Sequence, residues 1–246
     1  MQTFLFITFD SLQIISSIAI LRQIHTRRSI YALSIDFTLY SWVWAFTHTI
    51  ANCLYSFLPN VYAQYAKRYP LSPEIPHSTL LTAMCFFQLI LCTILVNKCF
   101  FVFKSQEKLS VVCKTVMLLC ISVFLRFSWL FCNGKATINV LDLADCLHNI
   151  GSVALACRLI PQISLNWFLE IFLLSNTFLT LQLCAATSGI VSLFIAYSSG
   201  LLWSEMPIGL PCQAVLGATW CASLVLLFQR SHYGQKHNIH RFQNLV

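Results

Sequence analysis

The chain has 246 residues, of which 58% are hydrophobic and 9% are charged, with a formal net charge of +7 and a mean hydropathy of +0.73. This composition excludes an ordinary soluble domain, in which about a quarter of the residues are charged. The positive charge does not indicate nucleic-acid binding, because the basic residues form no stripe with interleaved aromatic side chains.

Apolar runs long enough to cross a bilayer occur seven times along the chain. About 20 consecutive apolar residues span a hydrocarbon core of about 30 Å. The predicted spans are residues 3–21, 37–58, 79–103, 111–132, 141–165, 172–198 and 210–229. We therefore expect an all-α integral membrane protein, with residues 1–246 forming a single transmembrane domain of seven transmembrane helices.

The N-terminal start and the connection after the second span each favour a specific interpretation. The start, MQTFLFITFD, lacks the basic region and small-residue cleavage site of a secretory signal peptide, so we expect it to be retained as the first span. Residues 59–78, PNVYAQYAKRYPLSPEIPHS, contain four prolines and a charged cluster. This long connection is predicted to be neither a helix nor a span.

Basic residues gather on one side of the predicted membrane. Eleven lie at the ends and loops that follow odd-numbered spans, whereas Lys67, Arg68 and Lys135 lie on the other side and Arg126 lies inside the fourth span. By the positive-inside rule, the N-terminus faces the lumen or exterior and the C-terminus faces the cytosol. The structural interpretation of Arg126 is that it snorkels or pairs with an acid.

Twelve cysteines fall almost entirely within the apolar spans and form no C-x-x-C pair. This pattern favours small side chains that pack between helices, and metal binding or redox chemistry is the alternative. We expect no metal and no other cofactor.

Two stretches, residues 14–37 and residues 155–182, have a similar pattern. Each runs from the apolar end of one predicted helix through a polar segment into the next helix. This similarity predicts a first three-helix repeat, a linker helix, a second three-helix repeat and a cytosolic tail. Their bounds are residues 1–103, 104–135, 136–230 and 231–246. Parallel repeats of this kind place substrate near the midplane between the two halves.

The segment RLIPQISLNW, residues 158–167, places Pro161 inside the fifth span. Proline removes a backbone hydrogen bond and frees the carbonyl of Cys157, and Gln162 and Asn166 can satisfy the opened backbone groups. We expect an unravelled turn beside a central cavity, with Arg158 directed toward a substrate carboxylate or Asp36. An ordinary proline-kinked helix is the alternative.

Ionisable residues inside a membrane are costly, and each is a candidate functional group. Asp145 and His148 share a helix face at i and i+3, so a proton relay between them is geometrically possible. The alternative for Asp142 and Asp145 is that they lie at headgroup level and complement a helix N-terminus. Asp10 lies midway along the first span. The alternative for His48 in the second span is a satisfied interior histidine.

Four stretches, in chain order, resemble the cystinosin family of lysosomal cystine and proton cotransporters. LIPQISLNW resembles the family's second PQ-loop motif, and TRRSIYALSIDF (26–37) resembles the loop after the first motif. YAKRYPLSPEIPHS resembles the family's lumenal segment with its Lys-Tyr-Pro, and LLFQRSHY resembles the stretch before its short cytosolic tail. The resemblance covers nearly the whole chain.

This resemblance implies a PQ-loop or SWEET-like fold, in which two parallel three-helix bundles are joined by a linker helix (3+1+3). It implies proton-coupled export (symport) of L-cystine or a related amino acid from the lysosome or vacuole by alternating access, and no enzymatic activity. The implied partners are the amino acid, protons and the lipid bilayer. The lysosomal or vacuolar membrane is the first choice of location, and the endoplasmic reticulum or Golgi is the second.

Motif and resemblance together supply the candidate site. The residues expected to contact substrate or serve transport are Arg158, Pro161, Gln162, Asn166, Asn176, Gln182 and Ser223. The candidates for proton coupling are Asp36, Asp145 and His148. Asp36 lies in a preserved motif at the cytosolic entry to the second span, and a helix-capping role is its alternative.

The chain departs from the family at several of these positions. The first Pro-Gln pair is replaced by Ala19 and Ile20, family aspartates by Gln182 and Ser223, and a family lysine by Gly151. Glutamine and serine do not titrate at physiological pH. The alternative function is therefore a transport-deficient PQ-loop protein that acts as a receptor or as a trafficking or interaction factor. A third possibility is a seven-helix G-protein-coupled receptor. It is less favoured, because the ordered resemblance to the cystinosin family would then be a coincidence.

The end of the chain contains Phe242-x-x-Leu245, which resembles the aromatic-x-x-aliphatic sorting signal of the family's animal members. A solvated basic tail is the alternative interpretation.

Overall fold

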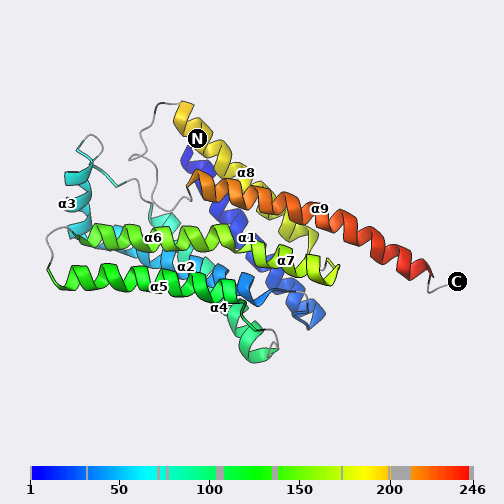
Figure 1. Cartoon of the computed structure of the whole chain (residues 1–246). Coiled ribbons are helices and arrows are strands. Elements are labelled where there is room, and N and C mark those ends of the chain that lie inside the picture. Colours follow the sequence, from blue (N-terminus) through cyan, green and yellow to red (C-terminus); the bar gives the residue numbers. More distant parts are fainter. Residues whose placement is uncertain are drawn as a thin grey trace.

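The computed structural model describes residues 2–31, 33–70, 73–75, 78–103, 108–134, 138–172, 174–198, 200 and 212–243. Within these ranges every regular element is a helix, as the apolar pattern predicts. Figure 1 shows long helices packed side by side, with the short helix α3 set across one end of the molecule.

The helix bounds follow the apolar runs closely. The first half contains α1 (Gln2–Arg27), α2 (Ile35–Phe57), α3 (Pro59–Arg68), α4 (Thr79–Asn97) and the π-helix η1 (Lys98–Val102), which continues α4. The second half contains α5 (Val111–Cys132), α6 (Val140–Cys157), α7 (Leu159–Leu169), α8 (Asn176–Ser198) and α9 (Gln213–Gln243). Each predicted span falls on one of these helices or on a consecutive pair.

In the described part of the chain, five stretches are long and apolar enough to cross a membrane, which fits a multi-pass membrane protein. They are Thr79–Val102, Val111–Cys132, Val140–Leu169, Asn176–Ile195 and Gln213–Tyr233. α1 and α2 are not among these five stretches. Both helices carry polar side chains that are buried between helices, including Gln13 and Ser16 of α1 and Thr38, His48 and Asn52 of α2.

The prediction that residues 59–78 contain no helix is wrong, because α3 occupies the first half of this segment. Pro59 is compatible with a helix here because it stands in the first turn, where a missing N–H needs no intrahelical partner. Val61 and Tyr65 are buried on one face of α3. The remaining prolines follow Tyr69, where α3 ends.

The two halves share one packing order. In the first half α4 packs against both α1 and α2, and in the second half α9 packs against α8 and against α6 and α7. Between the halves, α1 packs along α8, and α2 packs along α6. Helix α5 lies outside this arrangement against α6, and Cys113 is its one buried residue (Figure 1). Helix α4 therefore lies between α1 and α2, and α9 lies between α8 and the α6–α7 pair.

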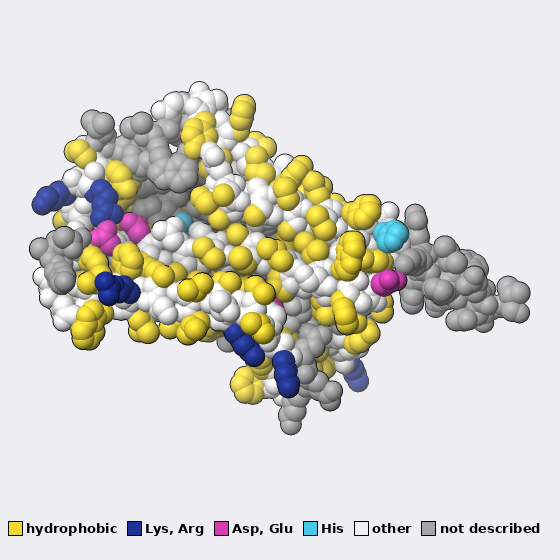
Figure 2. Space-filling view, in the orientation of Figure 1, with side chains coloured by type: hydrophobic (Ala, Val, Ile, Leu, Met, Phe, Trp, Pro, Cys, Tyr) yellow, Lys and Arg dark blue, Asp and Glu magenta, His cyan; other side chains and the backbone are white. Residues whose placement is uncertain are grey.

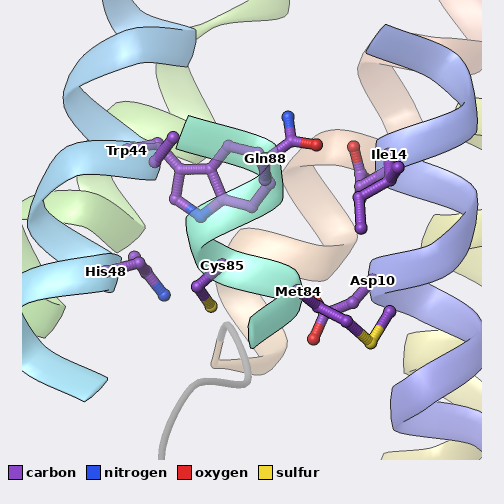
Figure 3. Close-up of a pocket in the computed structure, with 9 residues that line it drawn as sticks. Asp10, Ile14, Trp44, His48, Met84, Cys85 and Gln88 are labelled. Carbon is purple, nitrogen blue, oxygen red and sulfur yellow. The ribbon is translucent and has the colours of Figure 1, made fainter. Parts of the chain in front are cut away.

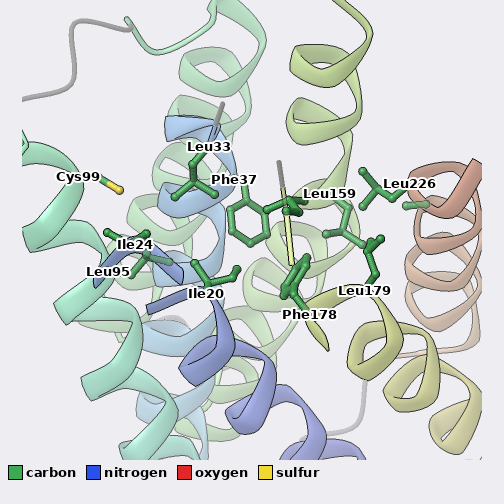
Figure 4. Close-up of a cluster of buried hydrophobic side chains, with 12 residues drawn as sticks. Ile20, Ile24, Leu33, Phe37, Leu95, Cys99, Leu159, Phe178, Leu179 and Leu226 are labelled. Atoms are coloured by element: carbon green, nitrogen blue, oxygen red, sulfur yellow. The ribbon is translucent and has the colours of Figure 1, made fainter. Parts of the chain in front are cut away.

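A cluster of buried hydrophobic side chains joins both halves (Figure 4). Phe37 of α2 and Phe178 of α8 meet edge to face with ring centroids 5.9 Å apart. Ile20 belongs to this cluster and is 3% exposed. Helix α1 is uninterrupted at Ala19 and Ile20, because neither residue lacks a backbone N–H as proline does.

The surface matches the hydropathy pattern. Figure 2 shows hydrophobic side chains over the middle of one face and charged side chains mainly toward its ends. At the other end of the chain, the segment predicted as a tail after residue 230 continues α9 as far as Gln243. Leu245 and the side chain of Phe242 lie outside the described part of the structure, and so does the proposed sorting motif.

Candidate functional site

Arg158 stands at the junction of α6 and α7, and its side chain is buried with 2% exposure. Its backbone is helical, with φ −60° and ψ −35°, so the prediction of an unravelled turn is wrong. The helix is interrupted for this residue alone. Pro161 accounts for the interruption, because it has no N–H to donate to the carbonyl of Cys157.

The guanidinium of Arg158 is held by neutral groups from three helices. Its Nη2 donates to Oε1 of Gln13 at 2.6 Å and also to Oε1 of Gln182. Nε2 of Gln182 donates to Oε1 of Gln13 at 3.1 Å and to Oγ of Ser16 at 2.6 Å. The guanidinium carbon lies 5.1 Å from the ring centroid of Trp44, a cation–π contact.

This cation has no acidic counterion in the described part of the chain, where no carboxylate forms an ion pair with Arg158. Its Nε is buried without a hydrogen-bond partner there. Amide oxygens and an aromatic face offset only part of the cost of burying a charge. The arrangement is therefore suited to receive an anionic group.

Gln162 and Asn166 connect α7 to two other helices. Oε1 of Gln162 accepts the backbone N–H of Ser34 at 2.9 Å, at the N-cap of α2, while its Nε2 donates to Oδ1 of Asn166 at 2.9 Å. Nδ2 of Asn166 donates to Oε1 of Gln229 on α9 at 3.2 Å. Gln229 lies in the stretch LLFQRSHY, which carries the family resemblance, but was not among the predicted site residues.

A small cavity lies between α1, α2 and α4, beside the partners of Arg158 (Figure 3). Its lining residues are Asp10, Gln13, Ile14, Trp44, Ala45, His48, Met84, Cys85 and Gln88. Its volume of about 20 Å³ holds about one water molecule. This cavity is too small for an amino acid, so among the described residues it does not form the substrate cavity that we predicted beside Arg158.

Four polar atoms at the wall of this cavity have no hydrogen-bond partner among the described residues. They are Nε2 of Gln13, Nε1 of Trp44, Nε2 of His48 and Oε1 of Gln88. All four side chains are at most 5% exposed. Buried polar groups in such a position are usually satisfied by a bound molecule or by ordered water.

Asp36 lies in the first turn of α2 and is buried. Its Oδ1 accepts the backbone N–H of Ser110 at 3.1 Å, at the N-cap of α5, while Ser34 caps α2 itself. Asp36 and Pro161 line a separate groove of about 620 Å³ between α2, α5 and α7. The hydrogen bonds of Arg158 go to Gln13 and Gln182, so the expected pairing of Arg158 with Asp36 is not formed.

Asp145 and His148, which share a face of α6, each also contact a neighbouring helix. Asp145 accepts hydrogen bonds from Tyr55 and, at 3.1 Å, from Arg68 of α3. The His148 ring lies against His48 of α2, with ring centroids 4.6 Å apart. Asp142 forms a capping box at the start of α6, as its structural alternative predicts, and also pairs with Arg68.

The structure separates the remaining candidates. Ser223 is fully buried in α9, where its Oγ donates to the carbonyl of Thr219 at 2.8 Å. Asn176 is exposed as the first residue of α8, apart from the buried polar groups. Gln13 and Trp44 were missed as contacts of Arg158. The sequence offered one signal for this contact, because Gln13 is a polar residue within an otherwise apolar span.

Comparison with models of known protein families found no match, and comparison with curated protein sequences found no significant match.

Proposed function

We propose that this protein is a cystinosin-like carrier that moves L-cystine or a related amino acid out of the lysosome or vacuole by alternating access, coupled to protons. In this proposal seven helices cross the membrane in a 3+1+3 arrangement, with α5 as the linker helix and the N-terminus in the lumen. The shared packing order of the two halves and the outlying position of α5 support this arrangement.

The observation that carries the proposal is the uncompensated buried charge of Arg158. An amino-acid carboxylate would supply the anion that the described residues do not, and a guanidinium binds a carboxylate in a two-point geometry. The neighbouring amides of Gln13 and Gln182 can exchange their contacts with Arg158 for contacts with the ligand. A charge kept at such a cost inside a membrane is expected to serve binding.

Alternating access requires the two halves to move against each other, and the Arg158 contacts lie on their boundary. Gln13 belongs to α1 in the first half, whereas Arg158 and Gln182 belong to the second. The small volume of the cavity, about 20 Å³, then corresponds to a state without bound substrate. Opening the contact between α1 and α8 would enlarge this cavity toward one side of the membrane.

The test is uptake of radiolabelled cystine into vesicles that contain the purified full chain, with acidic and with neutral interiors. Arg158→Ala is expected to abolish most uptake. Arg126→Ala is the matched control, because Arg126 is exposed on the neighbouring helix α5. Uptake that is equal in Arg158→Ala and in the unmodified protein would refute the binding role of Arg158.

A specific observation also favours the alternative function, a receptor or a trafficking or interaction factor without transport. The family aspartates are replaced by Gln182 and Ser223, and both of these side chains make internal hydrogen bonds. Absence of cystine uptake by a folded, correctly oriented protein would favour this alternative. Capture of the chain's partners by crosslinking in its own membrane would then identify its class.

A further inference from the structure

Two histidines meet inside the bundle. His48 of α2 is 3% exposed, and its ring centroid lies 4.6 Å from that of His148 of α6. On its other side, His48 meets the Trp44 ring edge to face at 6.0 Å. Two imidazoles at this distance repel each other when both are protonated, so the pair favours holding a single proton.

The position of His48 depends on a glycine in the helix opposite. A Cβ at Gly151 of α6 would come closer than 3.0 Å to Cδ2 of His48 and to Oγ1 of Thr47. Any larger residue at position 151 would push the imidazole away. The absence of a side chain on α6 at this point is therefore what allows a titratable ring from α2 to reach the interior.

The His48 side of the pair faces the small cavity. Nε2 of His48 is one of the four unpartnered polar atoms at the cavity wall, and Asp10 of α1 also lines the cavity. Figure 3 shows His48 pointing toward Cys85, with Asp10 on the helix across from it. A water molecule in about 20 Å³ would find the three or so polar partners that a buried water needs.

We propose that His48, His148 and Asp10 form an intramembrane proton-binding site that takes up one proton from the α3 end of the molecule. A proton adds to a ring nitrogen of His148, passes to His48, and moves through the cavity to the carboxylate of Asp10. Each transfer leaves its donor deprotonated. This inference rests on the proposed function, for which it supplies titratable groups in place of Gln182 and Ser223.

The surroundings of His48 limit the site to one proton. The titratable groups that face it are His148 on α6, Cys85 on α4 and Asp10 on α1 across the cavity. The Arg158 guanidinium lies over Trp44, one turn from His48, and disfavours a second positive charge. No titratable side chain of α7 or α3 has a described contact with His48.

Asp145 is the carboxylate that lies between the histidine pair and α3 along α6. His148 lies one turn beyond Asp145 on α6, and Asp145 contacts Tyr55 of α2 and Arg68 of α3. Asp145 itself is partly exposed, with 40% of its side chain accessible. The histidine pair therefore lies one helix turn from a partly exposed carboxylate at the α3 end of the molecule.

The test that does not depend on transport is nuclear magnetic resonance of the full chain, labelled with ¹⁵N-histidine and embedded in lipid nanodiscs. Signals of His48 and His148 are assigned by their loss in His48→Gln and His148→Gln. The signals of both rings are expected to change together on acidification, and removal of one ring should shift the titration midpoint of the other. Titration of each ring unaffected by loss of the other, or no titration, would overturn the proposal.

Asp10→Asn gives a second readout if a histidine variant fails to fold. It is expected to shift the midpoint of the histidine titration, because the carboxylate shares the proton. His232→Gln is the matched control, since His232 is exposed and stacks on Phe228 of the same helix. An unchanged midpoint in Asp10→Asn would remove Asp10 from the site.

Transport supplies an independent arm. Where the unmodified protein takes up cystine faster into acidic vesicles, His48→Gln and Asp10→Asn are each expected to lose this pH dependence, and His232→Gln is expected to retain it. Full pH dependence in both site variants would overturn a coupling role. If the unmodified protein moves no cystine, the proposed function fails, while the histidine titration still decides the proton site.

Discussion

Nη2 of Arg158 and Oε1 of Gln13 lie 2.6 Å apart across 145 residues of sequence, and they join the two halves of the chain. The contact brings a charged group and a neutral amide together in the interior. A guanidinium in this position is stabilised by amide dipoles and by the Trp44 ring, so it is sensitive to any negative charge brought within reach.

The first prediction supplies that charge from the protein itself. Gln182→Glu keeps the length of the side chain and places a carboxylate where Oε1 now accepts from Arg158. The carboxylate cannot donate the hydrogen bonds that Nε2 of Gln182 gives to Gln13 and Ser16. Because a hydrogen bond between charged groups is worth about 2 kcal/mol and Arg158 gains a counterion, we still expect a higher melting temperature in detergent. Because the new carboxylate competes with that of a substrate, we also expect cystine uptake to fall.

The matched control for this variant is Gln229→Glu. Gln229 is also a buried glutamine, and its contacts are with Asn166 and with the carbonyl of Ile163 on α7. A charge without a cationic partner is expected to lower the melting temperature. If both variants change stability in the same direction, the Arg158 site is not short of negative charge.

The second prediction concerns the contact between α6 and α2. Gly151→Ala would place a Cβ against His48 and Thr47, and overpacking of this kind costs about 1–3 kcal/mol. We expect a lower melting temperature and a changed ¹⁵N signal for His48. Gly217→Ala on α9 is the control, because a Cβ there meets no atom within 4 Å. Equal losses of stability in the two variants would contradict the close approach.

The third prediction concerns the backbone start of α2. Gln162→Ala removes the acceptor of the buried Ser34 N–H and the donor to Asn166. An unsatisfied buried group costs about 1–3 kcal/mol, so a clear loss of thermal stability is expected. Gln64→Ala is the comparison, because Gln64 accepts the Leu141 N–H at a part-buried helix start where water can replace it. A larger loss for Gln64→Ala would be inconsistent with the burial of Gln162.

The fourth prediction concerns Arg68, which pairs with Asp142 and Asp145 at the end of the molecule that carries α3. The hydrogen bond with Asp142 first, and then the charges of both acids, raise the pKa of Arg68. A raised pKa of a basic group means that its stabilisation is complete below its ordinary pKa and is lost only as the pH rises through the higher value. Arg68 therefore stays charged at every pH at which the protein would work.

Because Arg68 is partly exposed, its pairs are worth about 1 kcal/mol or less. Arg68→Gln is expected to lower the melting temperature at neutral pH slightly, and to increase proteolysis within α3. Lys67→Gln changes the neighbouring basic residue and serves as the control. Equal proteolysis of α3 in the two variants would show that the Arg68 pairs do not hold this helix in place.

Hydropathy located the helices of this protein well, because the length and polarity of a run are local properties of the chain. The predicted span 111–132 coincides with α5, and the predicted limits of the other spans differ from those of their helices by a few residues at most ends. The largest differences are at the C-terminal end, where α9 continues to Gln243, and at the missed helix α3. The prediction for residues 59–78 treated all four prolines as helix breakers, although Pro59 stands at a helix start, where proline is tolerated.

Residue identity alone also indicated that Arg158, Gln162 and Gln182 are polar groups in apolar surroundings, and all three are buried. Only the tertiary structure decided which groups they meet. Gln13 accepts a hydrogen bond from Arg158, and the His48 ring contacts His148 and passes close to Gly151. Asn176 is exposed on the surface. These contacts depend on how each helix is rotated and crossed against its neighbours, and side chains distant in the sequence determine that geometry through packing.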